Sequence, residues 1–167
     1  RQRQMCIRDR GKLTLDARVF PSAALAMDRP NPRNALGTAL LSSATACADI
    51  SDGLAQDLGH ILERSGVDAD VLWDAVPKHP ALAALSQEQQ VEAAMSGGDD
   101  YELVFTAPAD KRGLIEQASI SALTPVTRIG RIIEKKQSGA PLAIRDASGR
   151  PLFLPVQGFD HFAQGAD

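Results

Sequence analysis

An acidic turn at residues 48–54, Ala-Asp-Ile-Ser-Asp-Gly-Leu, carries the side chains best suited to chemistry. Asp49 and Asp52 are hard oxygen ligands close together in the chain, and Mg2+ prefers such ligands. Ser51 lies between them and offers a hydroxyl group. Unpaired amides at the start of a helix, together with the helix dipole, favour a bound phosphate. The pattern therefore indicates a site where Asp49 and Asp52 hold Mg2+ against a phosphate that Ser51 and the backbone amides receive.

A purely structural interpretation of this turn stays open. Serine and aspartate are common N-cap residues, whose side chains accept a hydrogen bond from a backbone amide in the first helical turn. Ser51 or Asp52 alone could fill that role. Two carboxylates flanking a serine are more than a cap requires, so the choice depends on the rest of the chain.

A second acidic turn follows at residues 96–103, Ser-Gly-Gly-Asp-Asp-Tyr-Glu-Leu. Paired glycines let the backbone approach a ligand closely. Taken alone, this segment would be a solvated turn leading into a strand. Two acidic, glycine-containing turns in one chain favour metal-bridged phosphate chemistry instead.

Other common catalytic patterns are missing from the sequence. There is no G-x-x-x-x-G-K-[ST] or G-x-G-x-x-G nucleotide motif, no H-E-x-x-H zinc motif and no G-x-S-x-G nucleophile elbow. His60, His79 and His161 are scattered, and His60 is expected on a helix surface. The sequence therefore argues against a zinc or serine hydrolase.

The first turn is predicted to join a strand to a helix. Residues 45–48 have strand character, and Leu54, Leu58, Ile61 and Leu62 recur at helical spacing on one apolar face. Gly66 is a suitable C-terminal stop for this helix.

The second turn is predicted to join a helix to a strand. Residues 86–89, Ser-Gln-Glu-Gln, match a capping box and open a helix that runs to about Met95. Residues 101–106 read as a strand with Tyr101, Leu103 and Phe105 on one face.

The remaining elements place the chain in the α/β (α+β) class, with a mixed sheet and helices packed on it. Further predictions are a helix at 33–43, strands at 67–76 and 126–133, a helix whose first turn includes Pro108, and a hairpin that pairs 142–144 with 152–154 around 146–149. Residues 1–10 are interpreted as a non-native lead, residues 11–27 as the end of a preceding domain, and residues 28–33 as a proline-stiffened linker.

Composition indicates a soluble protein of the cytoplasm. Hydrophobic residues make up 44% and charged residues 23% of the 167 residues, and the net charge is −3. This charge argues against a nucleic acid partner. The sequence has no signal-peptide pattern and no apolar run near the roughly 20 residues of a membrane span. Cys6 and Cys47 form no CxxC or zinc-like spacing, which favours a reducing compartment.

Four segments resemble, in residues and order, the bacterial thiamine-monophosphate kinase family. They are Asp-Ile-Ser-Asp-Gly-Leu at 49–54, Asp-Leu-Gly-His-Ile at 57–61, Ser-Gly-Gly-Asp-Asp-Tyr-Glu-Leu at 96–103 and Gly-Phe-Asp-His-Phe at 158–162, and the linker at 29–33 fits as well. That family is related to aminoimidazole ribonucleotide synthetase and selenophosphate synthetase, which share a two-domain ATP-binding fold.

The resemblance implies that residues 28–167 are the C-terminal domain of such a kinase, a three-layer α/β/α arrangement of the aminoimidazole ribonucleotide synthetase-like fold. Residues 11–27 would be a remnant of the N-terminal ATP-binding domain. The implied reaction is Mg2+-assisted direct phosphoryl transfer from ATP to thiamine phosphate, giving ADP and thiamine diphosphate. The full-length protein is expected to be a homodimer. Since the N-terminal domain would supply further acidic ligands, the isolated chain is expected to be inactive.

The resemblance also implies roles for single residues. Asp49 and Asp52 would bind the metal, and Ser51 would contact ATP. Asp99 stands where the family has a substrate-contacting glutamate and is one methylene shorter. Phe159 stands where the family has an aromatic ring near the thiamine, usually tyrosine, and it lacks the hydroxyl. A catalytic base is not required, because the attacking phosphate oxygen is already anionic.

Two alternatives stay open. One is another ATP-dependent enzyme of the same superfamily that uses the metal–phosphate site on a different acceptor. The other is a non-catalytic nucleotide-binding or interaction domain.

Overall fold

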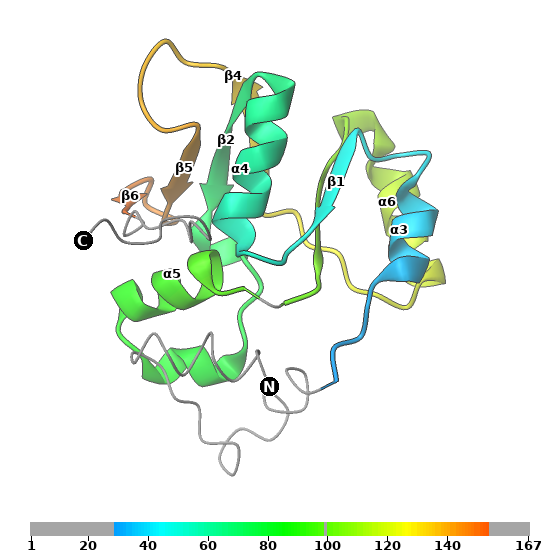
Figure 1. Ribbon diagram of the computed structural model, residues 1–167, viewed down its shortest axis with the longest axis horizontal. Helices are drawn as coiled ribbons and strands as arrows, with labels where there is room; N and C mark the ends of the chain where they lie inside the picture. The colour runs from blue at the N-terminus through cyan, green and yellow to red at the C-terminus, as the bar shows by residue number, and fades with distance from the viewer. Residues whose placement is uncertain (1–28, 99, 154–167) are drawn as a thin grey trace, which may run out of the picture.

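The computed structural model describes residues 29–98 and 100–153, which form two β-sheets with helices packed against them (Figure 1). The elements in chain order are α3 (Asn34–Leu40), β1 (Ala46–Asp49), α4 (Leu54–Ser65), β2 (Val67–Leu72), α5 (Gln87–Ser96), β3 (Leu103–Thr106), α6 (Arg112–Ser121), β4 (Gly130–Glu134), β5 (Leu142–Arg145) and β6 (Pro151–Leu152). Short 3-10 turns lie at Trp73–Ala75, Pro80–Ala84 and Ala109–Lys111. The predicted fold class, α/β with a mixed sheet, is confirmed.

The larger sheet has the strand order β4-β2-β5-β6. Strand β2 pairs antiparallel with β4 and parallel with β5, so the sheet is mixed. Helix α4 runs alongside β2 in Figure 1 and buries its four predicted apolar residues against one face of the sheet. Ala69, Val71 and Ile144 form the sheet side of this main core. Burial of a single leucine or isoleucine here contributes about 1.5–3 kcal/mol, so α4 is held firmly on the sheet.

The smaller sheet consists of β1 and β3, paired antiparallel from Ala46↔Thr106 to Asp49↔Leu103. Leu103 and Phe105 pack toward α3 and α6, which lie side by side beyond β1 (Figure 1). Val104 points the other way into the main core. The shared face predicted for Leu103 and Phe105 is thus confirmed, and β3 joins two cores. The predicted start of this strand at Tyr101 is wrong, because β3 begins at Leu103 and Tyr101 has a left-handed φ of 53°.

Several predicted boundaries are wrong by a few residues. The first helix covers Asn34–Leu40 rather than 33–43. Strand β2 ends at Leu72 rather than 76, because Trp73 turns into the core and starts a 3-10 turn closed by a Val76 N–H bond to the Trp73 carbonyl of 3.1 Å.

Two further differences involve a glycine and a proline. Strand β4 begins at Gly130 rather than 126; a Cβ at Gly130 would lie 2.2 Å from the Asp70 carbonyl oxygen, so only glycine permits this close pairing. Pro108 is extended (φ −62°, ψ 149°) and precedes the 3-10 turn, while α6 itself begins at Arg112. A proline fixes φ but not ψ, which is why the sequence could not locate the helix start.

Other local predictions are confirmed. Gly66 ends α4 in the left-handed conformation, with φ of 64°. The capping box is formed, with the Gln89 amide 3.3 Å from the Ser86 hydroxyl and the Ser86 amide 3.1 Å from the Gln89 side-chain oxygen. The β5–β6 hairpin is also present.

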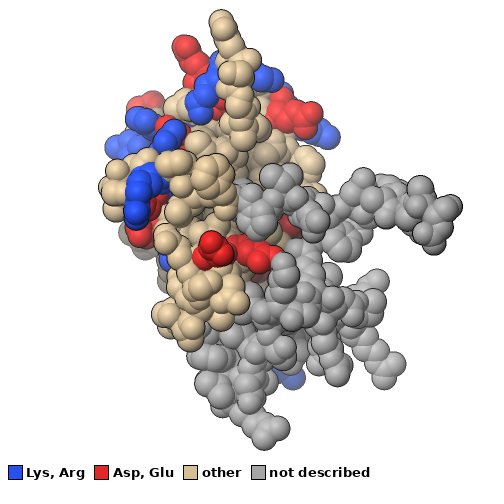
Figure 2. Space-filling view, turned by 90° about the vertical axis from the view of Figure 1, so that its left-hand side faces the viewer, with Lys and Arg blue, Asp and Glu red and all other residues tan. Residues whose placement is uncertain are grey.

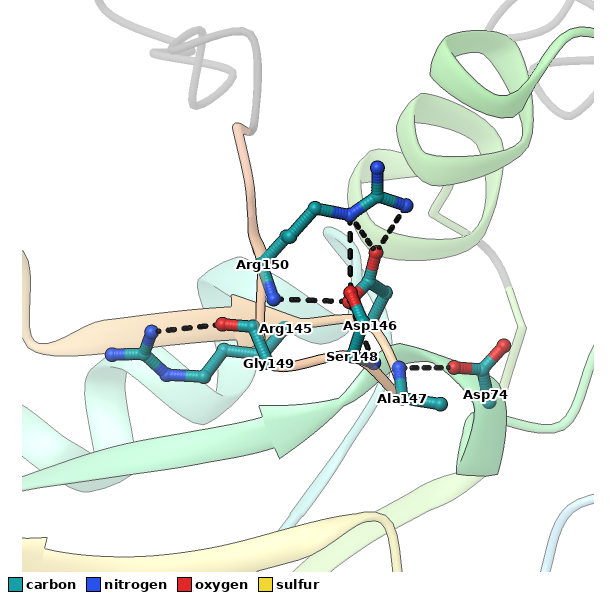
Figure 3. A network of polar contacts seen from close by, with 7 residues as sticks. All are labelled: Asp74, Arg145, Asp146, Ala147, Ser148, Gly149 and Arg150. Carbon is teal, nitrogen blue, oxygen red and sulfur yellow. Dashed lines mark hydrogen bonds and ion pairs between the residues drawn. The ribbon is translucent and has the colours of Figure 1, made fainter.

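Asp146 closes this hairpin (Figure 3). Its Oδ1 accepts hydrogen bonds from the Ser148 amide and hydroxyl (2.9 and 2.6 Å) and the Arg150 amide (3.0 Å), and its Oδ2 accepts one from Arg150 Nε (2.8 Å). These bonds, that from Ser148 above all, lower the pKa of Asp146 to about 2. The Ala147 amide also donates to Asp74, which ties the hairpin to the turn after β2.

On the face drawn in Figure 2, lysine and arginine side chains lie among aspartate and glutamate side chains at the top and along one edge. Such mixing of charges is typical of a solvated surface. Within the described ranges, no helix combines the length and apolar character needed to cross a membrane.

Candidate functional site

The first acidic turn connects β1 to α4, as predicted. Asp49 is exposed at the end of β1, Ser51 is exposed, and Asp52 is half-buried. The N-cap of α4 is Gly53, with φ of 113°, and no side chain caps the helix there. The interpretation of Ser51 or Asp52 as the cap is therefore wrong. The chain enters the helix at Gly53 with a positive φ, a backbone conformation that only glycine adopts readily.

Asp57, in the first turn of α4, holds this loop. Its side chain is buried, with 7% of the residue exposed, and its Oδ2 accepts hydrogen bonds from the amides of Ser51 (2.9 Å) and Asp52 (3.1 Å). The sequence-based expectation that these amides are unpaired is thus wrong, because a carboxylate one turn into the helix folds back onto them.

Sequence reasoning missed Asp57, although a signal was present. The residue lies three positions after Leu54, on the apolar side of the helix. A carboxylate in that position has to find hydrogen-bond partners, since leaving it unpaired in the core is costly. An acid on the buried face beside an acidic turn could therefore have been recognised as its support.

The second turn packs directly on the first. A Cβ at Gly98 would lie 2.4 Å from the Ser51 carbonyl oxygen and 3.4 Å from the Asp52 Cα. A Cβ at Gly53 would lie 3.0 Å from the Met95 carbonyl oxygen. The two acidic turns are thus in backbone contact, and glycine is required on both sides.

The segment after the second turn is anchored as well. Tyr101 adopts a left-handed φ of 53°, unusual for a residue with a side chain, and its amide donates to the Ile50 carbonyl at 3.1 Å. Next to it, Glu102 accepts two hydrogen bonds from Arg33, from Nε at 2.9 Å and from a terminal nitrogen at 2.6 Å. This pairing raises the pKa of Arg33. The predicted linker is therefore fastened beside the candidate site.

The turn is rich in uncompensated negative charge. Neither Asp49 nor Asp52 forms an ion pair or accepts a hydrogen bond through its carboxylate within the described part of the chain. Across residues 29–98 and 100–153, no group of three or more His, Cys, Asp or Glu side chains is placed to hold a metal ion. The two carboxylates are hard oxygen donors, the type of ligand that divalent cations such as Mg2+ prefer.

Comparison with known proteins identifies the family. Residues 15–142 match the family described as AIR synthase related protein, C-terminal domain. The chain belongs to this family. As an AIR synthase related C-terminal domain, it is 42% identical over 138 residues to the thiamine-monophosphate kinase of Haemophilus influenzae, covering 81% of this chain and 42% of that protein.

Solved structures that this chain matches also include thiamine-monophosphate kinases. The domain matches the crystal structure of thiamine-monophosphate kinase from Stenotrophomonas maltophilia with a TM-score of 0.70 and 38% identity, covering 86% of this chain and 46% of that one. It matches AaThiL complexed with AMPPCP and TMP with a TM-score of 0.66 and 25% identity, covering 96% and 47% of the two chains. This chain therefore spans less than half the length of these relatives.

The structure brings together most, but not all, of the predicted site. Asp49, Ser51 and Asp52 lie in one loop, and Gly98 of the second turn contacts its backbone. Asp99 and Phe159, predicted to contact substrate, lie outside the described residues, as do residues 1–28.

Proposed function

We propose that this chain is the C-terminal domain of a thiamine-phosphate kinase, which transfers a phosphoryl group from ATP to thiamine phosphate and yields thiamine diphosphate. The relatives named thiamine-monophosphate kinase support this proposal, and one related structure holds AMPPCP and TMP. The observation that carries it is the contact between the two acidic turns, together with the Asp49 and Asp52 carboxylates, which make no ion pair or hydrogen bond within the described residues.

Asp49 and Asp52 would supply two carboxylate ligands to Mg2+, and the Ser51 hydroxyl would contact ATP. Bound Mg2+ would offset the repulsion between the two phosphate groups. The amides of Ser51 and Asp52 already donate to Asp57, so the loop would receive phosphate through its side chains and the cation rather than through these amides.

On the acceptor side, Asp99 and Phe159 are proposed to contact thiamine phosphate. Phe159 would offer an aromatic face to the thiamine rings, and Asp99 would offer a carboxylate from the second turn. Replacement of Phe159 by alanine is expected to raise the KM for thiamine phosphate far more than the KM for ATP. Equal effects on both would indicate that Phe159 only tethers the C-terminal segment.

The whole protein is proposed to be a homodimer that acts in the cytoplasm, with the remaining metal ligands in the part of these relatives that the match does not cover. The described acids form only part of the metal array that a triphosphate and an acceptor phosphate require. The 167-residue chain is therefore expected to fold and bind Mg-nucleotide weakly without turnover. Turnover near about 1 per second would contradict this division of the site.

The test is a chimera in which residues 28–167 replace the matching part of the Haemophilus influenzae relative. With ATP and Mg2+ it is expected to convert thiamine phosphate to thiamine diphosphate and to sediment as a dimer. A folded chimera that phosphorylates a different acceptor in a panel of phosphate compounds would favour another enzyme of the superfamily. A chimera that binds nucleotide yet transfers nothing, while the parent enzyme is active, would favour a non-catalytic domain.

A further inference from the structure

Asp57 has no assigned role in the proposed reaction, yet its environment is unusual for an acid. It is buried beside Leu54 and Leu58 of the main core. A buried carboxylate is costly unless it is hydrogen-bonded. Within the described residues, its side chain accepts two hydrogen bonds, both from amides of the acidic turn and both on a single oxygen, Oδ2. Its own amide donates to the Gly53 carbonyl at 3.0 Å, so side chain and main chain both fasten the loop.

Helix capping does not account for this arrangement. The N-cap is Gly53, and Asp57 accepts from amides that precede the helix rather than from amides within it. The bonds instead fix the orientation of the peptide units of Ser51 and Asp52 in the loop. The second turn supports the same loop from the Ser51 carbonyl side, where Gly98 makes its close approach.

We propose that Asp57 is a positioning residue that holds the 50–53 loop in the shape in which Asp49 and Asp52 can share one divalent cation. This inference rests on the proposed function, in which those two carboxylates bind Mg2+. Asp57 itself does not touch the cation or the phosphate. It acts through the two backbone amides, as outer residues commonly do at metal sites.

Amide hydrogen exchange and Mn2+ titration of the 167-residue chain test this role separately from activity. Wild-type Ser51 and Asp52 amides are expected to be protected, and Asp57→Ala is expected to speed their exchange by about tenfold, the equivalent of one lost hydrogen bond. Paramagnetic broadening at the loop should then require about 10-fold more Mn2+. Glu63→Ala, which removes an exposed charge from the same helix, should change neither quantity.

Asp57→Asn separates the positioning role from the effect of the negative charge, because the asparagine side-chain oxygen can still accept hydrogen bonds from both amides. It is expected to keep the protection and to restore Mn2+ affinity to near the wild-type value, and it also serves if the alanine variant fails to fold. Affinity lost in Asp57→Asn with protection retained would overturn the positioning role in favour of a direct charge effect. Unchanged Mn2+ affinity in Asp57→Ala with protection lost would overturn it too. If Asp49→Asn and Asp52→Asn leave Mn2+ binding intact, the proposed metal site fails instead.

Discussion

Two loops of this domain are organised by an aspartate that accepts backbone amides, yet the charges around them differ. At the β5–β6 hairpin, Asp146 accepts the amides of Ser148 and Arg150 and pairs with the Arg150 guanidinium at 2.8 Å. At the acidic turn, Asp57 accepts the amides of Ser51 and Asp52, and no arginine or lysine among the described residues pairs with it.

The difference separates a structural loop from the proposed binding loop at residues 49–53. Asp146 finds its hydrogen-bond and ion-pair partners within the hairpin, so this loop needs no bound cation for its stability. The acidic turn adds Asp49 and Asp52 to Asp57 and leaves the three charges without a cationic partner in the described chain. Such an arrangement is unfavourable for folding alone and favourable for a bound cation, in keeping with the tendency of functional sites to break local rules.

The largest expected effect is that of Asp52→Asn in the chimera. The substitution keeps the shape of the side chain and removes one ligand charge, so activity should fall by about 100-fold or more, given that a metal supplies several kcal/mol of transition-state stabilisation. The melting temperature should stay nearly constant, because the Asp52 carboxylate makes no hydrogen bond within the described chain. Rate assays and calorimetry on the same preparation measure both. Retained activity with a large loss of stability would make the turn merely structural.

Gly98→Ala should have the next largest effect, because its Cβ would lie 2.4 Å from the Ser51 carbonyl oxygen. Relief of that overlap must separate the two turns, at an expected cost of about 1–3 kcal/mol in the free energy of unfolding. Gly59→Ala is the matched control, because outside the adjacent backbone of its own helix no atom lies within 4 Å of the added Cβ. In helix α4 it should stabilise the protein by up to about 1 kcal/mol. Denaturant unfolding of both variants distinguishes them, and equal stability would show that the turns separate easily.

The sequence was sufficient for those features that depend on apolar periodicity and local turn chemistry. Leu54, Leu58, Ile61 and Leu62 are all buried as predicted, and Gly66 ends their helix. The position of the acidic turn between strand and helix was predictable for the same reason. The end of β2 at Leu72 was not, because the tertiary packing of Trp73, rather than its own propensity, ends the strand.

The candidate site was predictable only in part. Residue types identified Asp49, Ser51 and Asp52 as site candidates. They did not show that the amides of Ser51 and Asp52 donate hydrogen bonds to Asp57. Periodicity treats Asp57 as a polar residue and cannot show that it folds back onto the preceding loop. The contact between the two turns was also hidden, because it depends on carbonyl oxygens and missing Cβ atoms.

The contribution of the β5–β6 hairpin to stability should depend on pH in the wild type but not in the Asp146→Asn variant. The pKa of Asp146 is lowered to about 2, chiefly by the Ser148 hydroxyl, from an ordinary carboxyl value of about 4. A depressed pKa stabilises the folded state above the ordinary value, and this contribution is lost as pH falls. The melting temperature of the wild type should therefore exceed that of Asp146→Asn above about pH 4 and approach it toward pH 2. A constant difference would contradict this, and Asp110→Asn on an exposed turn controls for loss of one charge.

The smallest expected effect on stability is that of the Arg33–Glu102 pair, which fastens the linker beside the binding loop. Its geometry is bidentate, with bonds of 2.9 and 2.6 Å, but the two side chains are 25% and 48% exposed. Solvent screening at such exposure limits the interaction to about 1 kcal/mol or less. A double-mutant cycle with Arg33→Met and Glu102→Gln should therefore give a small coupling energy that decreases in high salt. A coupling well above this value would mean that the linker contributes to the fold around the site, and that the binding loop is held from a third side.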